Sequence, residues 1–173
     1  EDIKFNLYRH DFNAATGSVS LTNDDHEFLT LSDWTGRFNI NEFAYKQIDV
    51  GYSVSMVQGS STITQSGNDF TADYAAGDYI LVINSGNTAR DIFRIVSVDS
   101  AAEMTTDKPC SFNGSTASGI PIVAGIISHY NKYTASELHL KQSSSIMSKK
   151  FVAGDTLTGL DSTTTGTIGS VDN

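Results

Sequence analysis

Cysteine and basic residues are scarce in this 173-residue chain, and each of these two shortages excludes a class of protein. The single cysteine, Cys110, cannot form an internal disulfide or a multi-cysteine zinc site. Lys and Arg total 11 against 20 Asp and Glu, and the net charge of −9 repels nucleic-acid phosphates. No apolar run approaches the roughly 18 residues that suggest a membrane-spanning helix. We therefore expect no disulfide scaffold, no zinc domain, no nucleic-acid partner and no membrane partner.

The N-terminus lacks both an initiator Met and the features of a secretory signal. No basic segment followed by an apolar stretch is present near residue 1, so no signal peptide is expected. A chain without an initiator Met is either processed or part of a longer polypeptide. We favour the second interpretation, because the strand pattern at the C-terminus stops where a further strand is expected.

Alternation of apolar and small polar residues predicts short strands in the middle of the chain. The candidate strands are 50–57, 62–65, 79–83, 91–98 and 103–106. The segment Asn84–Asn87 (Asn-Ser-Gly-Asn) has the composition of a hairpin loop. No convincing helix interrupts these strands. Residues 50–110 are therefore predicted to form a small antiparallel barrel or sandwich.

The flanking regions are predicted to be β-structure as well. Alternating segments in the flanks are 3–9, 17–22, 37–41 and 120–127, and a Gly/Ser-rich stretch at 111–119 is expected to be a loop. Residues 134–141 fit either a short helix capped by Thr134 or Ser136, or a strand at 137–141. We favour the strand, because the serines that follow it discourage a long helix. The predicted fold class is all-β, with small antiparallel barrel or sandwich modules joined by Gly/Ser-rich loops.

This pattern predicts four regions. Residues 1–49 are an aromatic-rich segment that forms interfaces, and residues 50–110 are the first β-module. Residues 111–150 connect it, by a loop and strands, to residues 151–173, the expected start of a second module that continues beyond the chain.

No group of residues has the spacing of a catalytic or metal site. The histidines are His10, His26, His129 and His139, and Glu137 is the carboxylate closest in sequence to the last pair. Residues 23–27 form an acidic cluster without the spacing of a calcium-binding loop. Asp69, Asp73 and Asp78 stand where turns favour Asp, and Cys110 is interpreted as a buried or incidental thiol. We predict that the protein is not an enzyme and carries no metal and no cofactor.

Two segments of the chain echo each other. Ala76-Gly77-Asp78-Tyr79-Ile80 is matched by Ala153-Gly154-Asp155-Thr156-Leu157, and residues 95–100 are matched by 168–173. In each copy a Gly-Asp turn precedes an apolar strand, and a second strand ends at a Ser-Val-Asp turn. Chance similarity between Thr/Ser/Gly hairpins is the alternative explanation.

The echoed segments carry a resemblance to a known group of proteins. The stretch from Phe70 to Val98 resembles small β-modules in virion structural proteins of tailed bacteriophages, and residues 151–168 are similar to a phage-tail pattern. The likeness is greatest to baseplate, neck and tail-fibre-associated proteins of T4-like phages, including cyanophages. It covers residues 55–108 and 129–173. The resemblance implies a virion protein that is assembled in the host cytoplasm and contacts other virion proteins and copies of itself.

The expected function is structural assembly, in the baseplate or tail apparatus. Low charge and dense aromatics suit protein interfaces, and exposed strand edges would pair with neighbouring subunits. The candidate interface residues are Phe5, Tyr8, Phe12, Phe28, Trp34, Phe38, Phe43 and Tyr45.

The alternative function is a receptor- or carbohydrate-binding module of a tail fibre or an extracellular adhesin. In that case exposed aromatic rings would stack on sugars, and hydroxyl side chains would bind them, which makes a glycan a possible partner. The candidate rings are Trp34, Tyr45, Tyr52, Tyr74, Tyr79, Tyr130 and Tyr133.

Overall fold

The computed structural model describes residues 26–48, 52–130, 137–141 and 150–172. Within these ranges the chain is nearly all β, as the sequence predicts, with eleven antiparallel strands and one four-residue helix. The strands are β1 (His26–Trp34), β2 (Phe43–Gln47), β3 (Tyr52–Met56), β4 (Thr62–Thr64), β5 (Tyr79–Ile83), β6 (Arg90–Ser100), β7 (Glu103–Thr106), β8 (Gly114–Tyr130), β9 (Glu137–Lys141), β10 (Thr156–Gly159) and β11 (Thr165–Asp172). Helix α1 is Phe70–Asp73, and the Asp69 carboxylate caps it by accepting from the N–H of Thr71. The strands expected at 3–9 and 17–22 lie outside the described residues.

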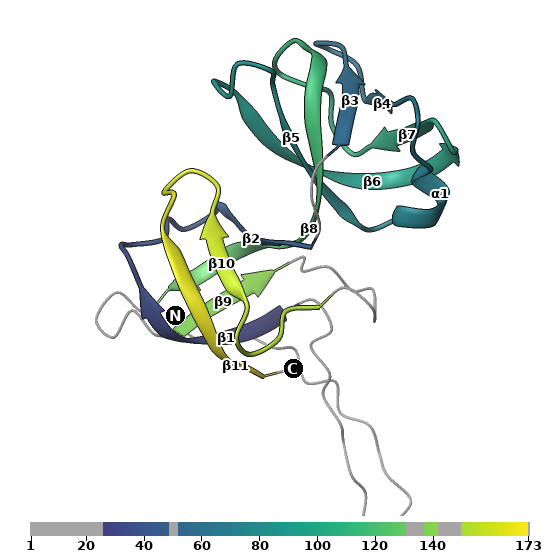
Figure 1. Ribbon diagram of the computed structural model, residues 1–173. Helices are drawn as coiled ribbons and strands as arrows, with labels where there is room; N and C mark the ends of the chain where they lie inside the picture. The colour runs from purple at the N-terminus through teal and green to yellow at the C-terminus, as the bar shows by residue number, and fades with distance from the viewer. Residues whose placement is uncertain (1–25, 49–51, 131–136, 142–149, 173) are drawn as a thin grey trace, which may run out of the picture.

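The strands form two closed circuits that share β8 (Figure 1). The central circuit runs β8-β3-β4-β7-β6-β5 and back to β8. The terminal circuit runs β8-β9-β1-β11-β10-β2 and back to β8. Figure 1 shows them as two lobes, one above the other, with β8 passing from one into the other.

Strand β8 has 17 residues, and its two halves serve different circuits. Its N-terminal half pairs with β3 and β5, and its C-terminal half pairs with β2 and β9. Ile122 belongs to both circuits, because it pairs with Tyr79 of β5 and with Gln47 of β2. The prediction of a Gly/Ser loop at 111–119 is therefore wrong from Gly114 onward. Gly119 is needed within the strand, because a Cβ there would lie 2.7 Å from Cγ1 of Val54.

Closure of the circuits leaves no edge strand among the described residues. Each described strand has a hydrogen-bonded neighbour on both sides. The described part of the chain therefore offers no strand with one side wholly unpaired for a neighbouring subunit to extend.

The sequence echo marks two turns with the same geometry. Gly77 and Gly154 have φ angles of 96° and 91°, which favour glycine. The N–H of Gly77 donates to the carbonyl of Ile95 at 2.8 Å, and the N–H of Gly154 donates to the carbonyl of Ile168 at 2.7 Å. In each turn the Asp side chain accepts from a backbone N–H three residues earlier. The β5–β6 and β10–β11 hairpins are therefore equivalent.

Matching these hairpins aligns the two circuits completely. Continuing around the circuits, β7 corresponds to β1, β4 to β9, β3 to the C-terminal half of β8, and the N-terminal half of β8 to β2. The register agrees: Val98 pairs with Met104, and the corresponding Val171 pairs with Leu29. The circuits have one strand order but different starting points along the chain. The terminal circuit is a circular permutation of the central circuit. Along the chain, the strands of the central circuit lie between β2 and the C-terminal half of β8.

This topology changes the expected regions. The 50–110 module needs the first half of β8 to close. Strands β10 and β11 of residues 151–172 pair with β2 and β1 of the N-terminal region, so both regions belong to the terminal circuit. The described part of the segment 111–150 contains the shared strand β8 and strand β9.

Two local predictions have opposite outcomes. The strand at 137–141 is confirmed as β9. The strand expected at 37–41 is wrong, because the chain turns there: Asn41 has a φ of 69°, and the Glu42 carboxylate accepts from the N–H of Asn39. Strand β2 begins after this turn, at Phe43.

Three apolar clusters form the core. One lies in the terminal circuit and one in the central circuit. The third joins them and contains Tyr79, Leu81, Ile92, Ile122, Ala124 and Leu160, with Phe43, Tyr45, Ile83 and Ile120 packed against it. We call this third cluster the junction.

Candidate functional sites

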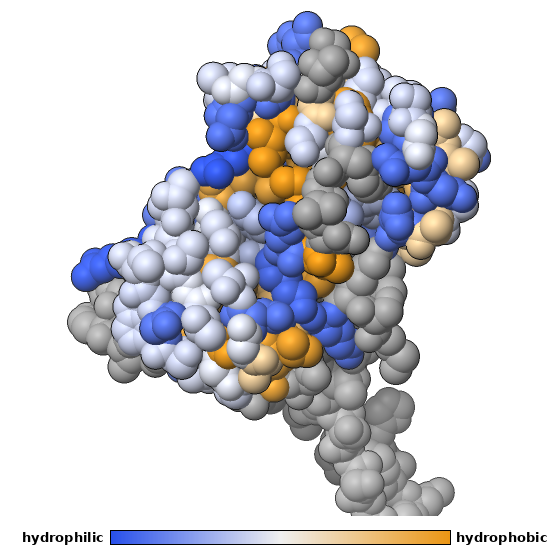
Figure 2. Space-filling view, in the orientation of Figure 1, coloured by the Kyte–Doolittle hydropathy of each residue, from blue (hydrophilic) through white to orange (hydrophobic). Residues whose placement is uncertain are grey.

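A hollow lies in the terminal circuit, where β1 ends beside β10 and β11. It encloses about 360 Å³ and is open to solvent. Its lining residues are Asp33, Trp34, Thr35, Thr156, Thr165, Gly166 and Thr167. In Figure 2 the face over β10 and β11 consists largely of residues of intermediate hydropathy. The hollow thus combines one large aromatic ring with hydroxyl groups and a carboxylate.

Gly166 allows a close approach of the backbone next to Trp34. The two residues are paired between β1 and β11, and glycine has no side chain to fill the site. A Cβ at Gly166 would lie 2.8 Å from the carbonyl oxygen of Asp33 and 3.6 Å from Cβ of Trp34. Trp34 remains 39% exposed, so part of its ring is accessible from the hollow.

Hydrogen bonds fix the polar groups around the ring. Oδ1 of Asp33 accepts from the N–H of Thr167 at 2.9 Å. The N–H of Thr165 donates to Oγ1 of Thr35 at 3.0 Å, and the hydroxyls of these two threonines are 3.2 Å apart. Oδ2 of Asp33 has no partner among the described residues. This lining is held in place by backbone contacts and still has acceptors and hydroxyls to offer.

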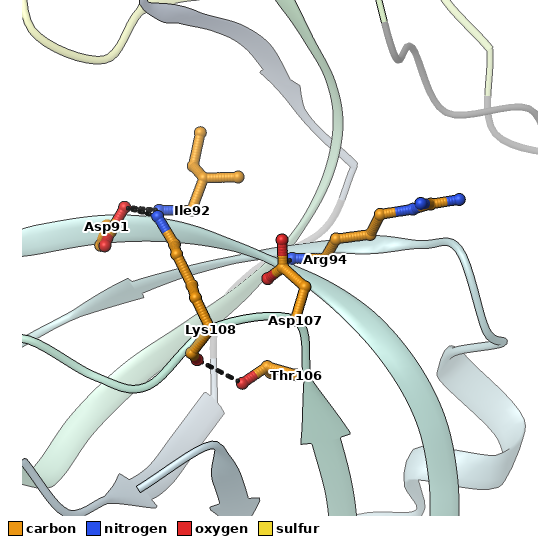
Figure 3. Close-up of polar contacts among 6 residues, drawn as sticks. All are labelled: Asp91, Ile92, Arg94, Thr106, Asp107 and Lys108. Carbon is orange, nitrogen blue, oxygen red and sulfur yellow. Dashed lines mark hydrogen bonds and ion pairs between the residues drawn. The ribbon is translucent and has the colours of Figure 1, made fainter. Parts of the chain in front are cut away.

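The corresponding corner of the central circuit is built on the same frame but is closed. Oδ1 of Asp107 accepts from the N–H of Arg94 at 3.0 Å, as Asp33 does from Thr167 (Figure 3). Phe93 takes the place of Gly166, and Lys108 takes the place of Trp34. The Nζ of Lys108 lies 5.2 Å from the centre of the Phe93 ring. Phe93 is fully buried in the central core, whereas the equivalent Gly166 has no side chain.

Lys108 also ties this corner to the junction. Its Nζ is 2.8 Å from Oδ1 of Asp91, as Figure 3 shows, and 5.9 Å from the centre of the Phe43 ring of the terminal circuit. The Asp91 oxygen also accepts from the N–H of Ile92, which lies in the junction itself. The hydroxyl of Thr106 donates to the carbonyl of Lys108 at 3.0 Å, which fixes the loop after β7.

A buried carboxylate organises the other end of β10. Glu42 is 3% exposed. Its Oε2 accepts from the N–H groups of Asp161 and Ser162, and its Oε1 accepts from the N–H of Asn39 and the hydroxyl of Ser162. These bonds anchor the turn between β10 and β11 to the start of β2. Glu42 has a structural role that the sequence pattern did not reveal.

The candidate interface aromatics are dispersed rather than gathered. Phe38 is enclosed by the terminal core at 4% exposure, so its side chain is unavailable to a partner. Phe43 and Tyr45 pack against the junction, and Phe28 makes an edge-to-face contact with His139. Trp34 is the exposed member of the described set. Phe5, Tyr8 and Phe12 lie outside the described residues.

The candidate sugar-binding rings have equally varied positions. Tyr74 and Tyr79 are buried, and Tyr45 is half-buried. Burial raises the pKa of the Tyr45 phenol and of the Tyr79 phenol above the usual value of 10.0. Tyr133 lies outside the described residues. Trp34 lines the hollow described above.

The candidate metal and thiol groups can also be placed. Within the described ranges, no three His, Cys, Asp or Glu side chains come together to hold a metal ion. Nε2 of His139 is 2.9 Å from the Glu137 carboxylate. Cys110 is buried, its thiol donates to the carbonyl of Phe112, and burial raises its thiol pKa. His10 and residues 23–25 of the acidic cluster are outside the described part.

Comparisons with known proteins found no relative of this chain, so its function is inferred from the geometry described above. No protein-family model, curated protein or solved structure matches the chain. In the described part, no helix has the length and apolar character needed to cross a membrane.

The sequence pattern missed most residues of the Trp34 hollow. Asp33, Thr165 and Gly166 belong to no recognisable motif, and they meet through pairing of β1 with β11, far apart in sequence. The sequence did contain one signal: when the two echoed hairpins are aligned, Gly166 is equivalent to Phe93. This alignment shows that the two hairpins differ in side-chain size at the position paired with Trp34.

Proposed function

We propose that this protein is a structural component of a phage virion, in the baseplate or tail apparatus, and works by protein–protein assembly. The resemblance of its hairpin segments to phage virion modules supports this role. The observation that carries the proposal is β8, a single 17-residue strand that belongs to both circuits. A continuous strand gives the two halves a fixed relative orientation, as a structural part of a particle requires.

The junction supports the same conclusion. The rings of Phe43 and Tyr79 meet edge to face at 5.8 Å between their centres, one from each circuit. Leu81, Ile92 and Ile122 are each at most 2% exposed there. Because relative motion of units is expected unless their interface is apolar and extensive, this packing favours a rigid body.

The surface offers side chains for assembly. Aliphatic side chains that are more than 40% exposed are Ile40, Ile48, Val57, Val96 and Val152. Since closed circuits leave no described strand edge for pairing, we place the contacts with other virion proteins and with copies of this chain on side-chain surfaces.

The test is the location of the protein in a lysate of phage-infected cells. We expect peptides from 52–130 to co-sediment with intact particles through a density gradient, as detected by mass spectrometry. A soluble host enzyme from the same lysate, which stays at the top of the gradient, is the control. Recovery of the chain only with the soluble proteins would overturn the proposal.

A further inference from the structure

We propose that the hollow beside Trp34 binds a neutral oligosaccharide. The two equivalent hairpins differ in the residues of one face. In the central circuit, Tyr79, Leu81 and Ile92 form the face that packs into the junction. The equivalent residues of the terminal circuit, in the same register, are Thr156, Thr158 and Thr165.

This replacement determines the chemistry of the exposed face. A face built to pack against protein would keep the apolar residues that its equivalent uses, because burial of apolar surface drives such contacts. Three threonines offer hydroxyls instead, each able to donate and to accept hydrogen bonds. Two of them, Thr156 and Thr165, line the hollow itself. The terminal face thus suits a ligand with many hydroxyl groups.

Trp34 supplies the platform that such a ligand needs. The face of an indole ring is electron-rich, and the C–H groups on the apolar face of a pyranose ring are weakly electropositive. A sugar ring stacked on Trp34 would place its hydroxyls toward Thr35, Thr165 and Asp33. Oδ2 of Asp33 is the acceptor with no partner among the described residues. The volume of about 360 Å³ is at the lower end of small-molecule sites, which corresponds to one or two sugar rings.

Charge sets the specificity. Asp33 lies in the hollow, and the chain has a net charge of −9. Both repel acidic sugars, so we assign hexose or N-acetylhexosamine oligomers without carboxylate, sulfate or phosphate groups. A glycan site is compatible with a virion and with other settings, so failure of the virion proposal would leave this site standing.

The experiment uses Trp34 as its own reporter, because it is the only tryptophan of the chain. The full chain is titrated with cellohexaose, maltohexaose and chitohexaose, and separately with hexagalacturonic acid. We expect a saturable change in tryptophan emission with at least one neutral oligomer and none with the acidic one. No saturable change with any neutral oligomer, or equal binding of the acidic one, would overturn the proposal.

Variants locate the binding site. Thr165→Val keeps the fluorescent reporter and removes one hydroxyl, so we expect affinity to fall about fivefold, as loss of one hydrogen bond predicts. Trp34→Ala, measured by calorimetry, is expected to abolish detectable binding. Val96→Ala, an exposed apolar change in the central circuit, is the control and should bind normally. Thermal unfolding confirms that each variant is folded. Undiminished binding by folded Trp34→Ala would assign the ligand to another site and overturn the proposal.

Discussion

The central and terminal circuits have the same strand order and the same Gly-Asp turns, but equivalent faces have opposite surroundings. Tyr79, Leu81 and Ile92 of the central circuit are buried in the junction. Their threonine equivalents in the terminal circuit lie at the surface or only partly buried. The strand order is the same in both, and the face with apolar side chains is the one that lies in the junction. One fold thereby provides both a rigid joint and an open hollow.

The largest expected effect on stability comes from removing the Phe93 side chain from the central circuit. Phe93 is fully buried, and Phe93→Ala should lower the free energy of unfolding by about 3–5 kcal/mol, the usual cost of such a cavity. Urea denaturation followed by circular dichroism measures this. Val96→Ala on the same strand is the control, and its effect should stay within about 0.5 kcal/mol because the side chain is exposed. Equal losses in the two variants would contradict the burial of Phe93 in the central core.

The next effect tests the polar anchor of the terminal circuit. Glu42→Ala leaves three backbone N–H groups and one hydroxyl without their acceptor. We expect a loss of about 2 kcal/mol, since a buried donor left unpaired costs roughly 1–3 kcal/mol and water can reach the exposed Asn39 and Asp161. Glu42→Gln keeps part of the acceptor capacity and should lose less. If both variants unfold at the same urea concentration as the parent chain, Glu42 does not stabilise the terminal circuit.

The equivalence of the two turns is tested by a matched pair. Gly77→Ala and Gly154→Ala each place a Cβ on a residue with positive φ, and neither meets a crowded neighbour. Each should cost about 1 kcal/mol, the usual penalty for a left-handed conformation in a non-glycine residue. Thermal or urea unfolding measures both. Costs that differ several-fold would show that the two turns are not equivalent.

The smallest effect concerns the junction at alkaline pH. Burial raises the pKa of the Tyr45 and Tyr79 phenols, so the folded state binds these protons more tightly than the unfolded state. Their contribution to stability is complete below the unfolded value of 10.0 and is lost as the pH rises above it. We expect the melting temperature to fall above about pH 10 and to fall less in Tyr79→Phe. A melting temperature with the same alkaline dependence in both proteins would exclude Tyr79 as a cause.

Particular segments show how far the sequence could be interpreted. The apolar run 79–83 and the Gly-Asp turns predicted β5, β10 and their hairpins correctly, because alternation and turn chemistry are local properties. The Gly/Ser stretch at 111–119 was wrongly predicted to be a loop throughout. Its small residues allow β8 to pair with β3 and β5, which are distant in sequence. The turn at Asn41 was missed for a similar reason, since the Glu42 carboxylate that organises it also binds residues 161 and 162.

Residue types and their spacing along short stretches of chain were enough to establish an all-β fold and the turns at Gly77 and Gly154. Such features are local, so they can be recognised before any strand has a partner. The folded molecule was needed to show that β8 serves two circuits, that the two ends of the described chain complete one of them, and that Gly166 lies beside Trp34. Those facts depend on which strands pair, and pairing is set by side chains that meet only after the chain has folded.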